Sequence, residues 1–140
     1  MIYPVFLKTL LRTTNIDGES DEIRYEGRAM AALRENGTWS VRYTDVENHG
    51  QTALQGADLW VSVSRDGDTK SRLLFRVGER LESVYVTPQG VFDMATQTTR
   101  IDQQIQEDFS EVKVDYELFL SGKLATTNEL TLTWTPLLTK

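Results

Sequence analysis

The single histidine of the chain, His49, is the first candidate for acid–base chemistry. A histidine acts as a general base near neutral pH when a nucleophile and an orienting carboxylate lie within hydrogen-bond reach. Asp45 and Glu47 are close to His49 along the chain, but no nucleophile stands beside it. A histidine that directly precedes Gly50 is more typical of a solvated turn, and we favour that interpretation.

Two acidic segments are the other candidates. Glu107, Asp108 and Glu111 could share acid and base roles in a cleft, but their place beside a turn favours ordinary exposed carboxylates. Residues 17–22 place carboxylates at alternate positions, yet the segment is shorter than the roughly twelve-residue calcium loop and lacks its distal glutamate. We interpret it as a charged hairpin tip. With no phosphate-binding glycine loop or nucleophile elbow, we predict no catalytic residue, no metal ligand and no cofactor.

Composition excludes several classes of protein. The chain has no cysteine, which excludes disulfide frameworks, iron–sulfur clusters and cysteine-liganded zinc. Lys and Arg number 15 against 21 Asp and Glu, and the net charge of −6 disfavours nucleic acid as a partner. Lys8 and Arg12 interrupt the apolar N-terminal segment, so we expect no signal peptide, no membrane contact and a cytoplasmic location. A length of 140 residues predicts one domain over 1–140.

The segments that must position these residues have a hydrophobic period of two, which is the period of a β-strand. In residues 111–120 every second side chain is apolar, and Lys113, Asp115 and Glu117 lie between them. The same alternation runs through residues 22–34, 39–44, 59–64, 72–77 and 127–136. We predict that the apolar sets face an interior, including Val112, Val114, Tyr116, Leu118, Leu130, Leu132 and Trp134.

Turn signals separate these strands. Asp17-Gly18, Asn36-Gly37 and Asp66-Gly67 predict type I′ hairpin turns, because both central residues of such a turn need a positive φ. Residues 87–90 fit a type I turn, and residues 121–124 fit another tight connection. Residues 47–56 show no periodicity and predict a loop. Residues 97–108 carry two isoleucines at helical spacing among threonines, and we favour a bent strand.

Nine or ten strands joined by tight turns predict an all-β fold, a single antiparallel meander. An open meander would expose two edges, so we expect closure into a barrel of eight or more strands, with a two-sheet sandwich as the alternative.

Three stretches of the chain resemble a known family. They are residues 43–47 leading into Gly50 and Thr52, residues 73–75 followed by Gly78, and residues 84–94 followed by Thr96 and Thr98. Together they are similar to the YwiB-like family of bacterial proteins, over nearly the whole chain. The resemblance implies a calycin-like, or lipocalin-type, β-barrel. That family has no established activity, so the resemblance implies no residue-specific function.

The inward face of residues 22–34 suggests how the barrel could be used. Gly27, Ala29 and Ala31 are consecutive inward positions with small side chains. An interior of this size is either filled by side chains or holds one small ligand. If a cavity is present, we predict that it binds a small, partly apolar ligand, with a lining of Tyr25, Tyr43, Phe75, Tyr116 and Trp134.

The outward face offers an alternative function. Trp60, Leu74, Phe119, Phe6 and Leu10 fall on the outer side of their strands. Clustered in space, they would mark an interaction surface and a protein that works as a scaffold module, as a monomer or a homodimer. An enzyme built on His49 or the acidic residues is a distant third interpretation.

Overall fold

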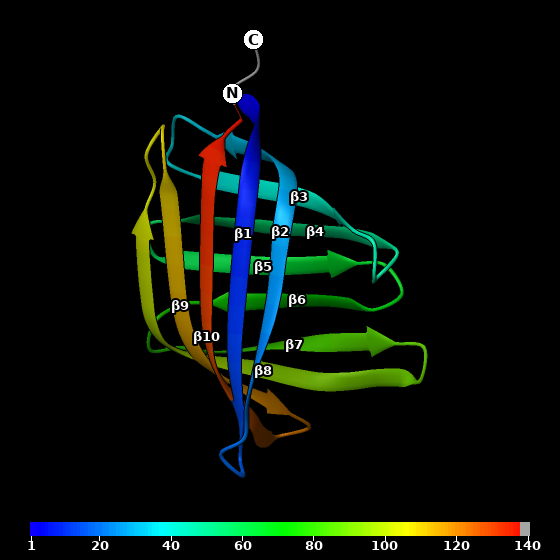
Figure 1. The fold of residues 1–140 in the computed structure, drawn as a ribbon. Helices are drawn as coiled ribbons and strands as arrows, with labels where there is room; N and C mark the ends of the chain where they lie inside the picture. Colours follow the sequence, from blue (N-terminus) through cyan, green and yellow to red (C-terminus); the bar gives the residue numbers. More distant parts are fainter. Residues whose placement is uncertain (138–140) are drawn as a thin grey trace.

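Ten β-strands form a closed barrel in the computed structural model, which describes residues 1–137 (Figure 1). They are β1 (Ile2–Asn15), β2 (Ser20–Leu33), β3 (Trp39–Asp45), β4 (Gly50–Ala57), β5 (Trp60–Asp66), β6 (Lys70–Phe75), β7 (Arg80–Thr87), β8 (Gly90–Gln104), β9 (Ser110–Leu120) and β10 (Lys123–Pro136). Each strand pairs in antiparallel fashion with its neighbours in sequence, and β1 pairs with β10. The predicted all-β meander barrel is therefore confirmed. Within the described residues, no helix has the length and apolar character needed to cross a membrane.

The barrel is flattened into two layers. In Figure 1, β1, β2, β9 and β10 run down the front, and β3 to β7 cross behind them. The layers separate where pairing is short: four residue pairs join β2 to β3, and two join β6 to β7. β8 belongs to both layers and bends at a register shift between Thr98 and Arg100. The predicted bent strand in 97–108 is thus confirmed as far as Gln104.

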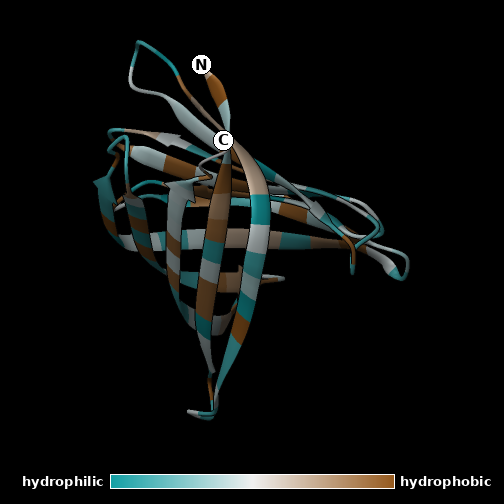
Figure 2. Cartoon of the chain, turned by 45° about the horizontal axis from the view of Figure 1, so that its top comes forward, coloured by the Kyte–Doolittle hydropathy of each residue, from teal (hydrophilic) through white to brown (hydrophobic). Residues whose placement is uncertain are grey.

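Alternate side chains fill the interior, as the period of two predicts. Figure 2 shows hydrophobic and hydrophilic bands alternating along the strands. Of the predicted inward residues, five are buried and two are half-buried: Val112, Val114, Tyr116, Leu132 and Trp134, then Leu118 and Leu130. Leu59 and Val77, at the ends of the alternating segments 59–64 and 72–77, lie just outside β5 and β6 and are exposed.

The prediction of a loop over 47–56 is wrong from Gly50 onward, because β4 begins there. Its inward residues are Thr52, Leu54 and Gly56, so a single large apolar side chain marks the inner face. Gly56 is small because the Trp39 ring lies against it: a Cβ at Gly56 would be 2.8 Å from Trp39 Cζ2. The hydrophobic alternation of β4 is therefore weak, because the Trp39 ring takes the space of a larger side chain at position 56.

The hairpins are where predicted, but the turn type is not. Gly18 and Gly37 have φ of +83° and +85°, whereas Asp17 and Asn36 do not have positive φ. Each glycine ends a three-residue loop, and Gly18 N–H donates to Asn15 O. Gly67 serves a close approach instead, since a Cβ there would lie 2.1 Å from Asn48 O. Both central residues have positive φ in the β9–β10 turn, at Ser121 and Gly122.

Candidate functional site

The interior of the barrel is open at one end and packed at the other. A cavity of about 310 Å³ lies at the open end, where β1 ends and β2 begins, and all ten strands contribute to its wall. Ile23 and Leu120 line it and are 55% and 36% exposed, so they mark its mouth. Pockets for small molecules measure about 300–1,000 Å³, and this one is at the lower limit.

Strand register arranges the inner face of β3 to β6 in three rows, since directly paired residues point to the same side. The closed-end row is Trp39, Gly56, Val61 and Phe75, and the middle row is Val41, Leu54, Val63 and Leu73. The third row, at the open end, is Tyr43, Thr52, Arg65 and Ser71, and it continues to Tyr85 on β7. We call these five residues the polar row. From the closed end outward, the wall changes from aromatic to aliphatic to polar.

The other layer presents both leucines and neutral polar side chains to the same cavity. Leu11 of β1, Leu118 of β9 and Leu130 of β10 line it there, together with threonines of β1 and β10 and with Asn128. A molecule that enters the mouth therefore meets the guanidinium group of Arg65 on one wall, and leucines with neutral polar groups on the other.

The cavity tyrosines are held in their neutral form. Burial raises the pKa of Tyr116 to about 12, and the positive charge of Arg65 opposes that rise. Burial also raises the pKa of Tyr43, against the hydrogen bond of Thr52 and the charge of Arg65. Tyr116 is 4% exposed and lines the cavity, and within residues 1–137 its hydroxyl has no hydrogen-bond partner. Both phenols are therefore available as hydrogen-bond donors at neutral pH.

The closed end has no comparable space. Trp39 and Trp134 are 1% and 3% exposed, and their ring centroids lie 5.1 Å apart. Gln103 lies between strands at this end: its Oε1 accepts the Trp39 indole N–H at 2.7 Å, and its Nε2 donates to Ala57 O at 2.5 Å. One amide thereby satisfies the buried indole and ties β8 to β3 and β4.

The five residues predicted as ligand-binding are divided between the two ends. Tyr43 and Tyr116 line the cavity, and Tyr25 stacks on Tyr43 with centroids 4.0 Å apart. Phe75 belongs to the closed-end row, and its ring centroid lies 4.5 Å from that of Tyr116. Trp134 belongs to the packed end. The structure thus brings three tyrosines together at the open end and separates Trp134 from them.

The small residues of β2 do not form the cavity wall. A Cβ at Gly27 would lie 2.6 Å from the Tyr25 hydroxyl oxygen, so the tyrosine itself occupies the space above the glycine. Tyr25 and Tyr43 stack beyond the paired part of β2 and β3, and they cover the gap between the layers. Ala29 and Ala31 are buried in the core cluster.

Sequence reasoning missed Arg65, Thr52 and Ser71, although a signal for one of them was present. Arg65 continues the alternation of Val61 and Val63, so its inward position follows from the phase of β5. A search for alternating hydrophobic residues stops at the first polar residue, but the inner face of β5 continues to Arg65.

The acid–base candidates do not meet. His49 is on the exposed β3–β4 hairpin, where its Nδ1 lies 2.5 Å from Asp68 Oδ2 of the β5–β6 hairpin. Asn48 beside it connects the same two hairpins, because its Oδ1 accepts the Thr69 N–H at 2.8 Å. Glu107 and Asp108 are exposed on the β8–β9 connection, at the opposite end of the barrel, and Glu111 is half-buried at the start of β9.

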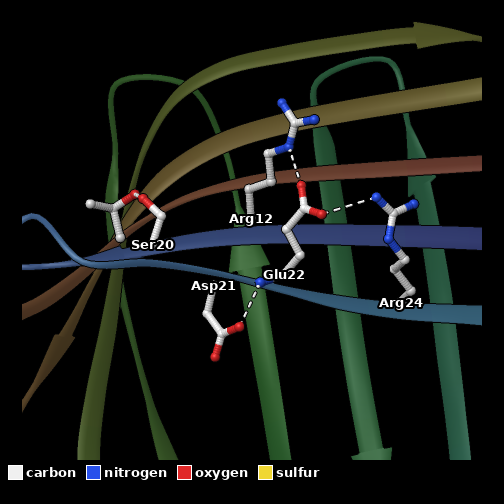
Figure 3. A network of polar contacts seen from close by, with 6 residues as sticks. Arg12, Ser20, Asp21, Glu22 and Arg24 are labelled. Carbon is white, nitrogen blue, oxygen red and sulfur yellow. Dashed lines mark hydrogen bonds and ion pairs between the residues drawn. The ribbon is translucent and has the colours of Figure 1, made fainter.

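One carboxylate of the acidic hairpin, Glu22, is paired with two arginines. Glu22 accepts hydrogen bonds from Arg12 Nε at 2.7 Å and Arg24 Nη2 at 3.0 Å, on the outer face of β1 and β2 (Figure 3). These bonds lower the pKa of the Glu22 carboxyl, the Arg12 bond most. Across residues 1–137, no three His, Cys, Asp or Glu side chains converge as a metal site requires.

The outer apolar residues do not form one patch. They lie on β1 (Phe6, Leu10), on β5 and β6 (Trp60, Leu74) and on β9 (Phe119), with at least one other strand between the groups. Arg80 covers the Phe119 ring at 4.2 Å from its centroid.

Comparison with known proteins identifies the family. The family model described as "Domain of unknown function (DUF1934)" matches residues 10–132. The chain belongs to this family. The fold is similar to the crystal structure of ywiB protein from Bacillus subtilis, with a TM-score of 0.86 and 18% identity over 98% of this chain and 94% of that one. The resemblance seen in the sequence is thus confirmed. No curated protein matches the chain.

Proposed function

We propose that this DUF1934 protein binds a small, partly apolar molecule in the open end of its barrel. The cavity of about 310 Å³ carries the proposal, because its lining combines many apolar side chains with a few polar groups and one charge. A cavity of this kind stabilises a ligand by removing apolar surface from water, while its few polar groups fix the orientation.

The β3–β4 and β5–β6 hairpins form the rim of the open end, and they support the proposal because hydrogen bonds hold them together without a ligand. Asn48 bonds to Thr69 across two hairpins through both its side-chain oxygen and its Nδ2, the latter at 3.0 Å from Thr69 O. Asp68 N–H donates to Asn48 O at 2.8 Å. A pocket that is already ordered costs less conformational entropy on binding.

Fluorescence of the neutral apolar dye N-phenylnaphthylamine tests the proposal. We expect saturable binding to the wild-type protein, and loss of binding in Leu130→Trp, which places an indole in the cavity. Thr131→Trp is the matched control, because Thr131 is adjacent on β10 and faces outward. Equal dye binding by wild type and Leu130→Trp would show that the cavity is not the site.

Self-association through the outer face stays a prediction. Size-exclusion chromatography with light scattering tests it, and a monomeric mass at high concentration would count against a stable homodimer.

A further inference from the structure

We infer that the cavity selects an amphiphile with an anionic head, a monocarboxylate, which Arg65 holds at the mouth while the hydrocarbon lies against the leucines. This inference rests on the proposed function and names the ligand class of the same site.

Arg65 is the charged side chain of the cavity. Among the lining residues that the structure describes, every other one is apolar or a neutral polar residue. Arg65 makes no ion pair or side-chain hydrogen bond within residues 1–137. The same holds for five other arginines of the described residues, and Arg65 is the one of these six that lines the cavity. A guanidinium without a partner, on the wall of a pocket, retains its full fork of donors for a ligand.

The acidic residues around the mouth are engaged with other groups. Asp66 pairs with Lys70 at 3.7 Å, and Asp68 with His49. Asp45 accepts from the Asn48 N–H at 3.3 Å and from the Thr52 hydroxyl at 3.4 Å. They leave Arg65 unpaired although the chain as a whole carries a net charge of −6.

A second, independent observation is the Tyr116 hydroxyl. The side chain is 4% exposed, lines the cavity, and makes no hydrogen bond to the part of the chain that the structure describes. The Tyr116 oxygen is not among the fully buried side-chain atoms that lack a partner, so it reaches the space of the cavity, where a ligand oxygen can accept its hydrogen bond. The Arg65 charge acts on both Tyr116 and Tyr43, which places the cation within electrostatic reach of both phenols.

A carboxylate fits this set better than the other head groups. It accepts from the arginine fork at two oxygens and still has lone pairs for a phenol O–H. A primary ammonium would face Arg65 with the same charge, and an alcohol would leave the guanidinium fork with one acceptor. The apolar part then lies beside Leu11, Leu118 and Leu130.

Three probes of equal chain length test the inference: octanoate, octanol and octylamine, each measured by displacement of N-phenylnaphthylamine. In the wild-type protein we expect octanoate to bind at least about fivefold more tightly than octanol, and octylamine to bind most weakly. Arg65→Gln should remove the preference for octanoate and leave octanol binding unchanged. Arg72→Gln is the matched control, because Arg72 is an exposed arginine of β6 outside the cavity lining.

The outcomes separate the two proposals. If octanol binds as tightly as octanoate in wild type, or if Arg65→Gln keeps the preference, the anionic head is refuted while the proposed function stands. If none of the probes displaces the dye and the dye itself does not bind, the proposed function fails. Should Arg65→Gln not fold, the Arg65 Nε–H resonance of the wild-type protein serves instead: octanoate should shift it and octanol should not.

Discussion

The two ends of this barrel are built from the same strands and differ in what the inward positions hold. At the closed end, the Trp39 ring occupies the space over Gly56, and Gln103 satisfies the indole N–H. At the open end, four residues further along β3, the inward position is Tyr43, which belongs to the polar row. The strands also pair differently at the two ends, because β2 pairs with β3 only at the closed end and β6 with β7 only at the open end. Side-chain volume and strand pairing together make one end solid and leave space in the other.

The comparison shows how a small barrel can obtain stability and a binding site from one core. A close-packed region supplies most of the dispersion and burial free energy, and it leaves the other region free to keep polar groups and space. The rim of the open end is held by backbone and amide hydrogen bonds around Asn48 rather than by packing.

The largest expected effect is at the closed end. Trp39→Ala should lower the free energy of unfolding by about 3–5 kcal/mol, because it removes a fully buried ring and leaves the Gln103 amide without its donor. Urea denaturation measures the change. Trp60→Ala, on the half-buried outer face of β5, is the control and should cost clearly less. Equal costs would mean that the closed end is not the stabilising region.

Tyr116 at the open end should make stability depend on alkaline pH. Its pKa is about 12 in the folded protein against the ordinary 10, so the native state keeps a proton that the unfolded state loses. Stability from this group is complete below pH 10 and declines by up to about 2.7 kcal/mol as the pH rises to 12, at about 1.36 kcal/mol per unit.

Tyr116→Phe isolates that contribution. The variant should have near-normal stability at pH 7, since the hydroxyl has no partner among the described residues, and a smaller decline between pH 10 and 12. Chemical denaturation at a series of pH values compares the two proteins. An identical decline in both would show that Tyr116 titrates as an exposed phenol.

Two glycines sharpen the contrast between the ends. Gly56→Ala should cost about 1–3 kcal/mol, because the new Cβ would meet both Trp39 and the Trp60 carbonyl oxygen at 2.8 Å. Gly27→Ala should cost less, because its close contact is the far end of the Tyr25 side chain, which can move. Thermal unfolding ranks the two variants, and a larger loss at Gly27 would contradict the ranking.

Alternation made the barrel predictable, because inward and outward positions of β2, β3, β9 and β10 differ strongly in hydrophobicity. β4 was missed because its inner face includes Thr52 and Gly56, whose identities follow from the neighbouring side chains and not from a local pattern. The turns were located by their glycines, but the turn type depended on the φ of the preceding residue, which Asp and Asn leave open.

The site was less predictable than the fold. Tyr43 and Tyr116 were predicted because they fall on inward positions of the alternation. Trp134 also falls on an inward position, but it lies at the other end of the barrel. Depth along the barrel is set by how far each strand is shifted against the next, and one sequence does not contain those shifts. The same limit hid the polar row, whose members are far apart in sequence and adjacent only through strand register.

The smallest expected effect comes from adding volume to the open end. Leu130→Phe should change the free energy of unfolding by less than about 1 kcal/mol, because the larger ring extends into a cavity that already exists. The same substitution at Leu7, which is fully buried and pairs with Trp134, should cost about 1–3 kcal/mol, because no space is available there. Urea denaturation of both variants gives the difference directly. If Leu130→Phe were as costly as Leu7→Phe, the open end would be packed in solution and could not admit a ligand without rearrangement.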